Sequence, residues 1–353
     1  MQTTLVKVSR MLTKADIALI TKAAALIKSG ELVAFPTETV YGLGANAFDE
    51  VAVKKIYLAK GRPSDNPMIV HVSSQAMLKK VVDDIPTNAK KLMDSFWPGP
   101  LTIVLQKSEN IPFIVTGGLD TVAVRMPSNK IALALINASK VPIAAPSANL
   151  SGKPSPTDAL HVLDDLEGKI GMILDGGESH FGLESTVISL AGVGGAKPKL
   201  LRPGAISRKQ IEKIIGEIDD SFVVGNCEDS AKVENPASPG MKYKHYSPEA
   251  KVVILSKISP DGASSLANSY AKQGKKVALM LLSGKYSGNE SLFKGFCEIH
   301  SFSSPKASAK ALFRSFRELD KLGAGVVFVE SVSEEGIGLA LMNRLRKAAS
   351  ETI

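Results

Sequence analysis

The hydrophobic pattern of the first two hundred residues alternates between helical spacing and short apolar runs. Ile17, Ile20, Ala24 and Ile27 recur on one helical face, which predicts a helix that begins after Thr13. Further helices are predicted at 49–60, 86–96, 131–137, from 157 or 158 onward, and at 207–218. The apolar runs predict strands at 32–35, 68–72, 101–105, 121–127, 141–145, 172–174, 184–190 and 200–205. Strands that alternate with helices indicate an α/β fold.

The pattern changes after residue 218. Residues 219–249 show little periodicity and carry several prolines, which predicts a linker. Beyond them, strands are predicted at 252–255, 277–282 and 326–329, and helices at 263–272, 306–322 and 337–349. This order predicts a small parallel α/β unit. The chain is therefore expected to have a domain at 1–218, a linker at 219–249 and a second domain at 250–353.

Composition limits the classes of function. The chain has 353 residues and a net charge of +8, which is shared evenly between residues 1–204 and the remainder. This balance gives no basic tail but suits acidic ligands such as nucleotides. Cys227 and Cys297 lack the spacing of a zinc site or a disulfide framework, which fits a reducing compartment. The sequence shows neither a secretory signal nor an apolar run of membrane-spanning length, so we expect a cytoplasmic protein without a membrane partner.

The loop at 60–67 carries the first candidate chemistry. Arg62 and Asn66 each precede a proline, which favours extended backbone. Residues two apart in an extended segment point to one side, so Lys60 and Arg62 are expected to project together. An ammonium beside a guanidinium would make a clamp for phosphate or carboxylate. A solvated basic loop is the commoner explanation of such a pair taken alone.

Other polar residues lie at the ends of predicted strands. Ser147 and Asn149 are again two apart in an extended run and should share a side. Strand alternation turns Arg125 away from the apolar side, either to solvent or into a cavity, and Arg202 is extended because it precedes a proline. His71 lies among apolar neighbours, where a packing role is the commoner one. No Ser/His/Asp set, cysteine nucleophile or carboxylate pair is apparent, which favours positioning and charge neutralisation over covalent catalysis.

Several motifs in this order resemble the threonylcarbamoyl-AMP synthase family, whose catalytic module is the YrdC-like domain. They lie at 36–44 (PTETVYGLG), 60–63 with 66–67, 96–102, 145–149 with 151–152, and 184–186. Matches at 238–248 and 342–347 extend the resemblance to the long, two-domain form. The chain departs from the family pattern at Asn129–Lys130, where His-Pro is usual, and at Ser189, where Asp is common.

The resemblance implies a fold and a reaction. The fold is a YrdC-like twisted mixed sheet with helices around a basic cavity, followed by a small Rossmann-like parallel α/β domain. The reaction condenses L-threonine, bicarbonate and ATP to threonylcarbamoyl-AMP and pyrophosphate, as a nucleotidyltransferase acting in tRNA modification. The product passes to a downstream tRNA threonylcarbamoyl-transfer enzyme, and a weak tRNA contact is expected. Mg²⁺ is expected to bind mainly through the ATP phosphates, with no metal site built from protein side chains.

The resemblance also assigns site residues. The catalytic residues are Lys60 and Arg62. The ATP-binding residues are Lys60, Arg62, Asn66, Thr121, Ser147, Asn149, Ser155, Arg202, Tyr243 and Tyr246. The threonine-binding residues are Thr39, His71, Arg125, Ala145 and Ser185. A lid of Lys242, Tyr243, His245 and Tyr246 is expected to fold over the cleft and exclude water; a solvated linker is its alternative.

Two other functions stay open. A YrdC-like module could bind RNA without ATP turnover, but it would need base-stacking aromatics, and the chain has only 5% aromatic residues and one tryptophan. A carbamoyl-transfer enzyme with a related module would carry acylphosphatase-like and zinc-finger regions. The two isolated cysteines exclude the zinc finger.

Overall fold

The computed structural model describes residues 2–191, 197–224, 246–257 and 259–353. These residues form two compact units. The N-terminal unit takes the described residues of Met1–Ser151 and Ser155–Tyr243, and the C-terminal unit takes those of Gly152–Pro154 and Lys244–Ile353. Most of the predicted linker, including the lid residues Lys242, Tyr243 and His245, lies outside the described residues.

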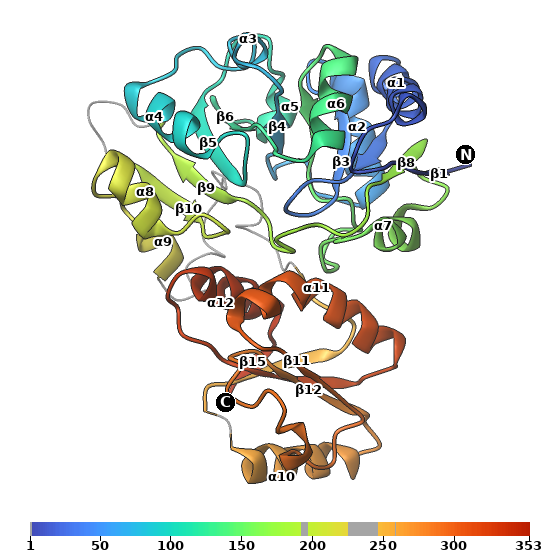
Figure 1. Cartoon of the computed structure of the whole chain (residues 1–353), viewed down its shortest axis with the longest axis vertical. Helices are drawn as coiled ribbons and strands as arrows, with labels where there is room; N and C mark the ends of the chain where they lie inside the picture. The colour runs from blue at the N-terminus through green and yellow to red at the C-terminus, as the bar shows by residue number, and fades with distance from the viewer. Residues whose placement is uncertain (1, 192–196, 225–245, 258) are drawn as a thin grey trace. The chain divides into compact units, whose positions relative to one another are not determined.

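A ten-stranded mixed sheet runs through the N-terminal unit (Figure 1), which confirms the predicted mixed α/β fold. In spatial order its strands are β1 (Thr4–Lys7), β8 (Met172–Asp175), β2 (Val33–Phe35), β3 (Gly42–Asn46), β7 (Ile143–Ala144), β4 (Ile69–His71), β6 (Thr121–Arg125), β5 (Leu101–Gln106), β9 (Thr186–Ser189) and β10 (Lys199–Arg202). The pairs β1/β8, β8/β2, β4/β6 and β5/β9 are parallel, and the other neighbours are antiparallel.

Strand β3 was not predicted, because its sequence GLGAN lacks the apolar run of a buried strand. Its glycines are required by close packing. A Cβ on Gly44 would lie 2.7 Å from Ile143 Cγ2 and 2.8 Å from Phe35 Cε1, so a larger residue would push the neighbouring strands apart. Strand β1, also missed, is a short strand at the sheet edge with mostly exposed side chains.

The helices of the N-terminal unit are α1 (Lys14–Lys28), α2 (Glu50–Lys60), α3 (Gln75–Leu78), α4 (Thr87–Phe96), α5 (Phe113–Thr116), α6 (Lys130–Ser139), α7 (Ala159–Leu166), α8 (Arg208–Ile215) and α9 (Ser221–Val224). Thr13 caps α1 as predicted, in a capping box with Asp16. Helices α1 and α6 pack together on one face of the sheet, around a core that includes Ile27 and Leu135. The sequence predicted a helix to residue 218, but α8 ends at Ile215 because Gly216 leaves the helical conformation at φ +82°.

The C-terminal unit is built on a five-stranded sheet in which every pair is parallel, which confirms the predicted parallel α/β unit. Its strands, in spatial order, are β13 (Glu298–Ser301), β12 (Val277–Leu281), β14 (Val326–Glu330), β11 (Lys251–Leu255) and β15 (Glu351–Thr352). Helix α10 (Pro260–Ala271) covers one face, and α11 (Pro305–Lys321) and α12 (Ile337–Ala348) cover the other (Figure 1). A 3₁₀ turn, η2 (Glu290–Leu292), precedes β13.

Across the described parts of both units, every helix is too short or too polar to cross a membrane.

Candidate functional site

A row of buried polar side chains crosses one face of the N-terminal sheet over neighbouring strands. His71 in β4 is the register partner of Arg125 in β6. Ile103 of β5 pairs with Val124, which sets Thr102 beside Arg125 on the same face. The Thr102 and Ser185 hydroxyl oxygens lie 2.7 Å apart, and Ser185 directly precedes β9. The row therefore joins residues that are more than one hundred positions apart in the sequence.

Arg202, at the end of β10, extends this row. Its Nη2 donates to the Ser185 hydroxyl over 3.1 Å, and its Nε donates to the Ser185 carbonyl over 3.1 Å. Gly204 permits this close approach, because a Cβ there would lie 2.3 Å from the backbone nitrogen of Thr186. Arg202 thus contacts Ser185, one of the predicted threonine-binding residues, directly.

Arg125 is held from three sides. Its Nη1 donates to Thr39 Oγ1 over 2.9 Å, its Nε donates to the Gly99 carbonyl over 3.2 Å, and its Nη2 forms an ion pair with Glu38 Oε1 over 2.7 Å. The side chain is only 3% exposed, so of the two expectations for Arg125, solvent is excluded.

Sequence reasoning missed Glu38. A carboxylate in the turn after a buried strand signals that a cation lies nearby, but the sequence does not show which cation it is.

The turn before β3 supports Thr39. The Thr37 hydroxyl accepts the N–H groups of Thr39 and Val40 and donates to the Val40 carbonyl. Thr37 Oγ1 and Thr39 Oγ1 lie 2.8 Å apart. Local backbone satisfaction therefore accounts for Thr37, whereas the Thr39 hydroxyl reaches the Arg125 side chain.

Burial and the neighbouring charges set the protonation states in the row. Burial, helped by the positive charge of Arg125, lowers the pKa of His71 to about 3, so the imidazole is neutral. Burial raises the pKa of Glu38, but the charge and contact of Arg125 outweigh it and hold that pKa below its usual range. The His71 and Phe35 rings pack at nearly a right angle, and within the described structure His71 Nδ1 has no hydrogen-bond partner.

The predicted geometry of the Lys60–Arg62 clamp is wrong. Lys60 is the last residue of α2, and Gly61 caps that helix in the left-handed region at φ +60°. The segment is therefore not extended, and a spacing of two residues does not bring the Lys60 and Arg62 side chains to one side. Lys60 Nζ donates to the carbonyl oxygens of Ser147, over 2.6 Å, and Asn149. Arg62 Nη2 instead donates to the carbonyls of Asn66 and Pro67, in its own loop.

Ser147 and Asn149 share a side as predicted, since Ser147 Oγ donates to Asn149 Oδ1 over 2.6 Å. The start of β3 holds their loop: Leu43 N donates to the Pro146 carbonyl, and Ala148 N donates to the Tyr41 carbonyl, each over 2.9 Å. The motifs at 36–44, 60–63 and 145–149 are thus brought into contact by backbone hydrogen bonds and by Lys60.

Of the remaining predicted site residues, Asn66 lacks hydrogen-bond partners for its side chain among the residues described, whereas Ser155 and Ala145 already have partners within the chain. The Asn66 side chain is 1% exposed, and in the described ranges neither its amide oxygen nor its nitrogen has a hydrogen-bond partner. Ser155 Oγ donates to Glu184 Oε1 over 2.6 Å. Thr121 is half-buried at the start of β6, and Ala145 N donates to the Ile69 carbonyl. The unsatisfied Asn66 amide is the one most in need of a further partner.

Tyr246 belongs to the C-terminal unit. Its ring stacks on Phe313 with centroids 5.3 Å apart, and the Arg344 guanidinium lies 5.6 Å from the ring centre. The predicted contact between Tyr246 and the nucleotide remains a prediction, and the other lid residues lie outside the described ranges.

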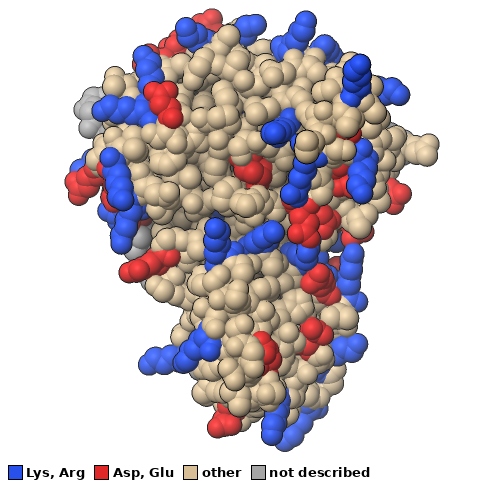
Figure 2. All heavy atoms as spheres, in the orientation of Figure 1, with Lys and Arg blue, Asp and Glu red and all other residues tan. Residues whose placement is uncertain are grey.

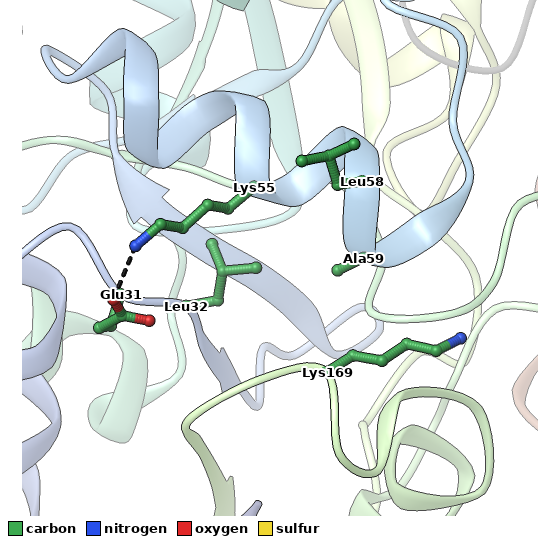
Figure 3. A pocket seen from close by; sticks show the side chains of 6 residues that line it. All are labelled: Glu31, Leu32, Lys55, Leu58, Ala59 and Lys169. Atoms are coloured by element: carbon green, nitrogen blue, oxygen red, sulfur yellow. Dashed lines mark hydrogen bonds and ion pairs between the residues drawn. The ribbon is translucent and has the colours of Figure 1, made fainter. Parts of the chain in front are cut away.

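An open pocket of about 450 Å³ lies elsewhere on the N-terminal unit (Figure 3). Its lining residues are Glu31, Leu32, Lys55, Leu58, Ala59 and Lys169, and none of them belongs to the predicted site. Lys55 is already paired with Glu31 over 2.6 Å. Apart from this pair, its lining holds one further charged residue, Lys169, so the pocket lacks the set of buried polar side chains that converge in the row.

The described residues contain no cluster of three or more His, Cys, Asp or Glu side chains that could hold a metal ion. On the face drawn in Figure 2, the Lys and Arg side chains of the N-terminal unit are scattered among Asp and Glu. That face shows no basic stripe of the kind that binds a nucleic-acid backbone.

Two family models match the chain. A model named for Sua5, YciO and YrdC, described as "Telomere recombination", matches residues 25–204. A model described as "Threonylcarbamoyl-AMP synthase, C-terminal domain" matches residues 206–350.

Relatives named threonylcarbamoyl-AMP synthase are similar over most of their length. The Pyrococcus abyssi protein is 50% identical over 335 residues, with 94% of each chain covered. The Bacillus subtilis protein is 47% identical over 331 residues, which covers 94% of this chain and 92% of the relative. The crystal structure of Pyrococcus abyssi Sua5 complexed with L-threonine superposes with a TM-score of 0.89 and 46% identity, covering 99% of both chains.

Proposed function

The chain belongs to the threonylcarbamoyl-AMP synthase family, and we propose that the buried polar row of its N-terminal unit joins L-threonine, bicarbonate and ATP. The threonine amine forms a bond to the carbon of bicarbonate, and water is lost, which gives an N-carboxylated threonine. The new carboxylate attacks the α-phosphate of ATP, which releases pyrophosphate and forms threonylcarbamoyl-AMP. Enzymes of this family transfer an adenylyl group, so the activity is that of a nucleotidyltransferase.

The observation that carries this proposal is the buried, partly unsatisfied Arg125. A guanidinium has five N–H donors, and the described residues engage three of them on Arg125. The remaining donors suit a carboxylate, because leaving a buried donor without a partner is costly. Thr39, His71, Ala145 and Ser185 complete the proposed threonine site. A Sua5 relative that binds L-threonine supports this choice of substrate.

The nucleotide is proposed to lie against the other motif group. Asn66, with both amide atoms unsatisfied, offers a donor and an acceptor to the base, the ribose or a phosphate. Lys60 and Arg62 are the proposed catalytic residues, since they bring positive charge to the polyphosphate. Thr121, Ser147, Asn149, Ser155, Arg202, Tyr243 and Tyr246 are the further proposed ATP contacts.

The reaction needs charge neutralisation above all. A carboxylate that approaches a polyphosphate meets like-charge repulsion, and fixed cations in a water-poor site offset this repulsion as the bond forms. Alignment of the carboxylate with the leaving pyrophosphate supplies the rest. Mg²⁺ would enter with the ATP phosphates and neutralise part of their charge. The described side chains offer no carboxylate cage for a resident ion.

The proposal also includes a lid over the reactants, an enzyme that takes the product, and a location in the cell. Residues 242–246 would close over the reactants as a lid, within a linker at 219–249 between domains at 1–218 and 250–353. The product would pass to an enzyme that transfers the threonylcarbamoyl group to tRNA, with a weak tRNA contact. A cytoplasmic location fits Cys297, which is a free and exposed thiol.

Pyrophosphate release from ATP tests this function. We expect release with threonine and bicarbonate together, and background release when either is omitted. Release that continues without threonine would contradict the proposal. Salt-sensitive RNA binding without any ATP turnover would favour the RNA-binding alternative.

A further inference from the structure

Glu38 is a buried carboxylate that the proposed reaction leaves without a role. Its side chain is 7% exposed, and its Oε1 lies 2.7 Å from Arg125 Nη2. A carboxylate this far from water needs a charged partner, and Arg125 provides it. The pair places one negative charge beside the guanidinium that we propose binds the threonine carboxylate.

The pair fixes the position of Arg125. Glu38 at Nη2, Thr39 at Nη1 and the Gly99 carbonyl at Nε define the plane of the guanidinium. Two of these contacts come from consecutive residues of one turn, which the Thr37 hydroxyl closes. The remaining N–H groups of Arg125 therefore have a set direction before any ligand arrives, which lowers the ordering cost of binding.

The pair also sets the net charge around Arg125. The guanidinium contributes +1, Glu38 contributes −1, and His71 is neutral, so these three groups sum to zero. The next buried charges beside Ser185 are Arg202, which contacts Ser185 rather than Arg125, and Glu184, which accepts from Ser155, and these two groups are opposite in sign. An amino acid at neutral pH is a zwitterion of net charge zero, whereas a carboxylic acid without an amino group is a net anion. A neutral buried site therefore suits the zwitterion, because a net anion would leave one charge uncompensated.

We propose that Glu38 is a specificity-determining residue that makes the amino-acid site select a zwitterion over a simple carboxylate. The proposal rests on the function proposed above and adds to it the basis of substrate selection. Glu38 acts through Arg125 and through its own charge, and it takes no part in bond making.

The test compares L-threonine with 3-hydroxybutanoate, which keeps the carboxylate and hydroxyl but lacks the ammonium. Calorimetric titration gives the dissociation constant of each ligand for the wild-type chain and for Glu38→Gln. We expect the wild-type chain to bind threonine more tightly than 3-hydroxybutanoate. In Glu38→Gln, the ratio of the two dissociation constants should fall about tenfold, which is the factor for one charge contact of moderate strength. Glu38→Asp, which keeps the charge, should restore the preference. Glu31→Gln, in the exposed pair with Lys55, serves as the matched control and should leave the preference unchanged.

A purely structural role would weaken both ligands equally and leave their ratio at the wild-type value, which would overturn the proposal. If Glu38→Gln fails to fold, the double variant Glu38→Gln/Arg125→Gln removes both charges without burying an unpaired one. Because that variant is again neutral around the ligand, the proposal predicts that it binds both ligands more weakly but keeps the preference for threonine, and loss of the preference would overturn the proposal. Threonine-dependent pyrophosphate release by the wild-type chain, measured in parallel, shows whether the proposed function itself stands.

Discussion

Acidification should destabilise the N-terminal unit because His71 is buried as a neutral imidazole. Its pKa is about 3 in the folded chain, against 6.5 for an ordinary histidine. Between these values the unfolded chain binds a proton that the folded chain does not, so the free energy of unfolding falls as the pH falls. The contribution is fully present above pH 6.5 and is lost progressively toward pH 3.

The magnitude follows from the width of that window. One pKa unit corresponds to about 1.4 kcal/mol, so lowering the pH from about 7 to about 5 should cost about 2 kcal/mol through His71 alone. Replacing His71 by Asn removes the titrating group while keeping a polar side chain of similar reach. The variant should be less stable at pH 7, because packing against Phe35 is lost, but its stability should fall less on acidification.

Urea unfolding, followed by the fluorescence of Trp97, measures both quantities. Trp97 is the sole tryptophan and lies in the N-terminal unit, so its signal reports that unit. The difference in unfolding free energy between wild type and His71→Asn should narrow by about 2 kcal/mol between pH 7 and pH 5. Equal pH dependence in the two chains would show that His71 is not buried as a neutral group, and the description of the row would be wrong.

Three further substitutions test separate parts of the account. Lys60→Ala should reduce kcat/KM for pyrophosphate release by about 2–4 kcal/mol of transition-state stabilisation, and normal release would refute its catalytic role. Arg125→Lys keeps the charge but loses the planar guanidinium, so the KM for threonine should rise about tenfold while the KM for ATP stays unchanged. An equal rise in both KM values would place Arg125 outside the threonine site. Asp49→Ala removes the side chain that accepts the N–H groups of Val51 and Ala52 at the start of α2, and should cost about 1 kcal/mol in urea unfolding with little change in threonine KM.

Much of the fold could be predicted because the local signals agreed with the tertiary structure. The predicted cap at Thr13 and the helix at 49–60 are found, since a capping side chain and an apolar face specify a helix locally. Strands β3, β13 and β15 were missed for different reasons. The sequence of β3 lacks an apolar run, β13 and β15 are short, and β15 pairs with β11 at the other end of the C-terminal unit's sequence. Their conformation is decided by neighbouring strands rather than by propensity.

In the candidate site, too, locally determined features could be predicted and contacts between distant segments could not. Ser147 and Asn149 share a side because their segment is extended, as expected. Lys60 and Arg62 do not follow that rule. The predicted helix at 49–60 already contains Lys60, and Gly61 ends that helix in the left-handed region, so the two residues do not lie in one extended segment. The contact between Glu38 and Arg125 joins positions far apart in the sequence, and no local spacing predicts it.

A crystal structure with L-threonine and a non-hydrolysable ATP analogue tests the central claim most directly. The account predicts the threonine carboxylate against Arg125, with Glu38 still paired to the guanidinium, and the phosphates near Lys60 and Arg62. Ligands bound elsewhere, for example in the open pocket beside Lys55 and Lys169, with the buried row unchanged and unoccupied, would contradict it.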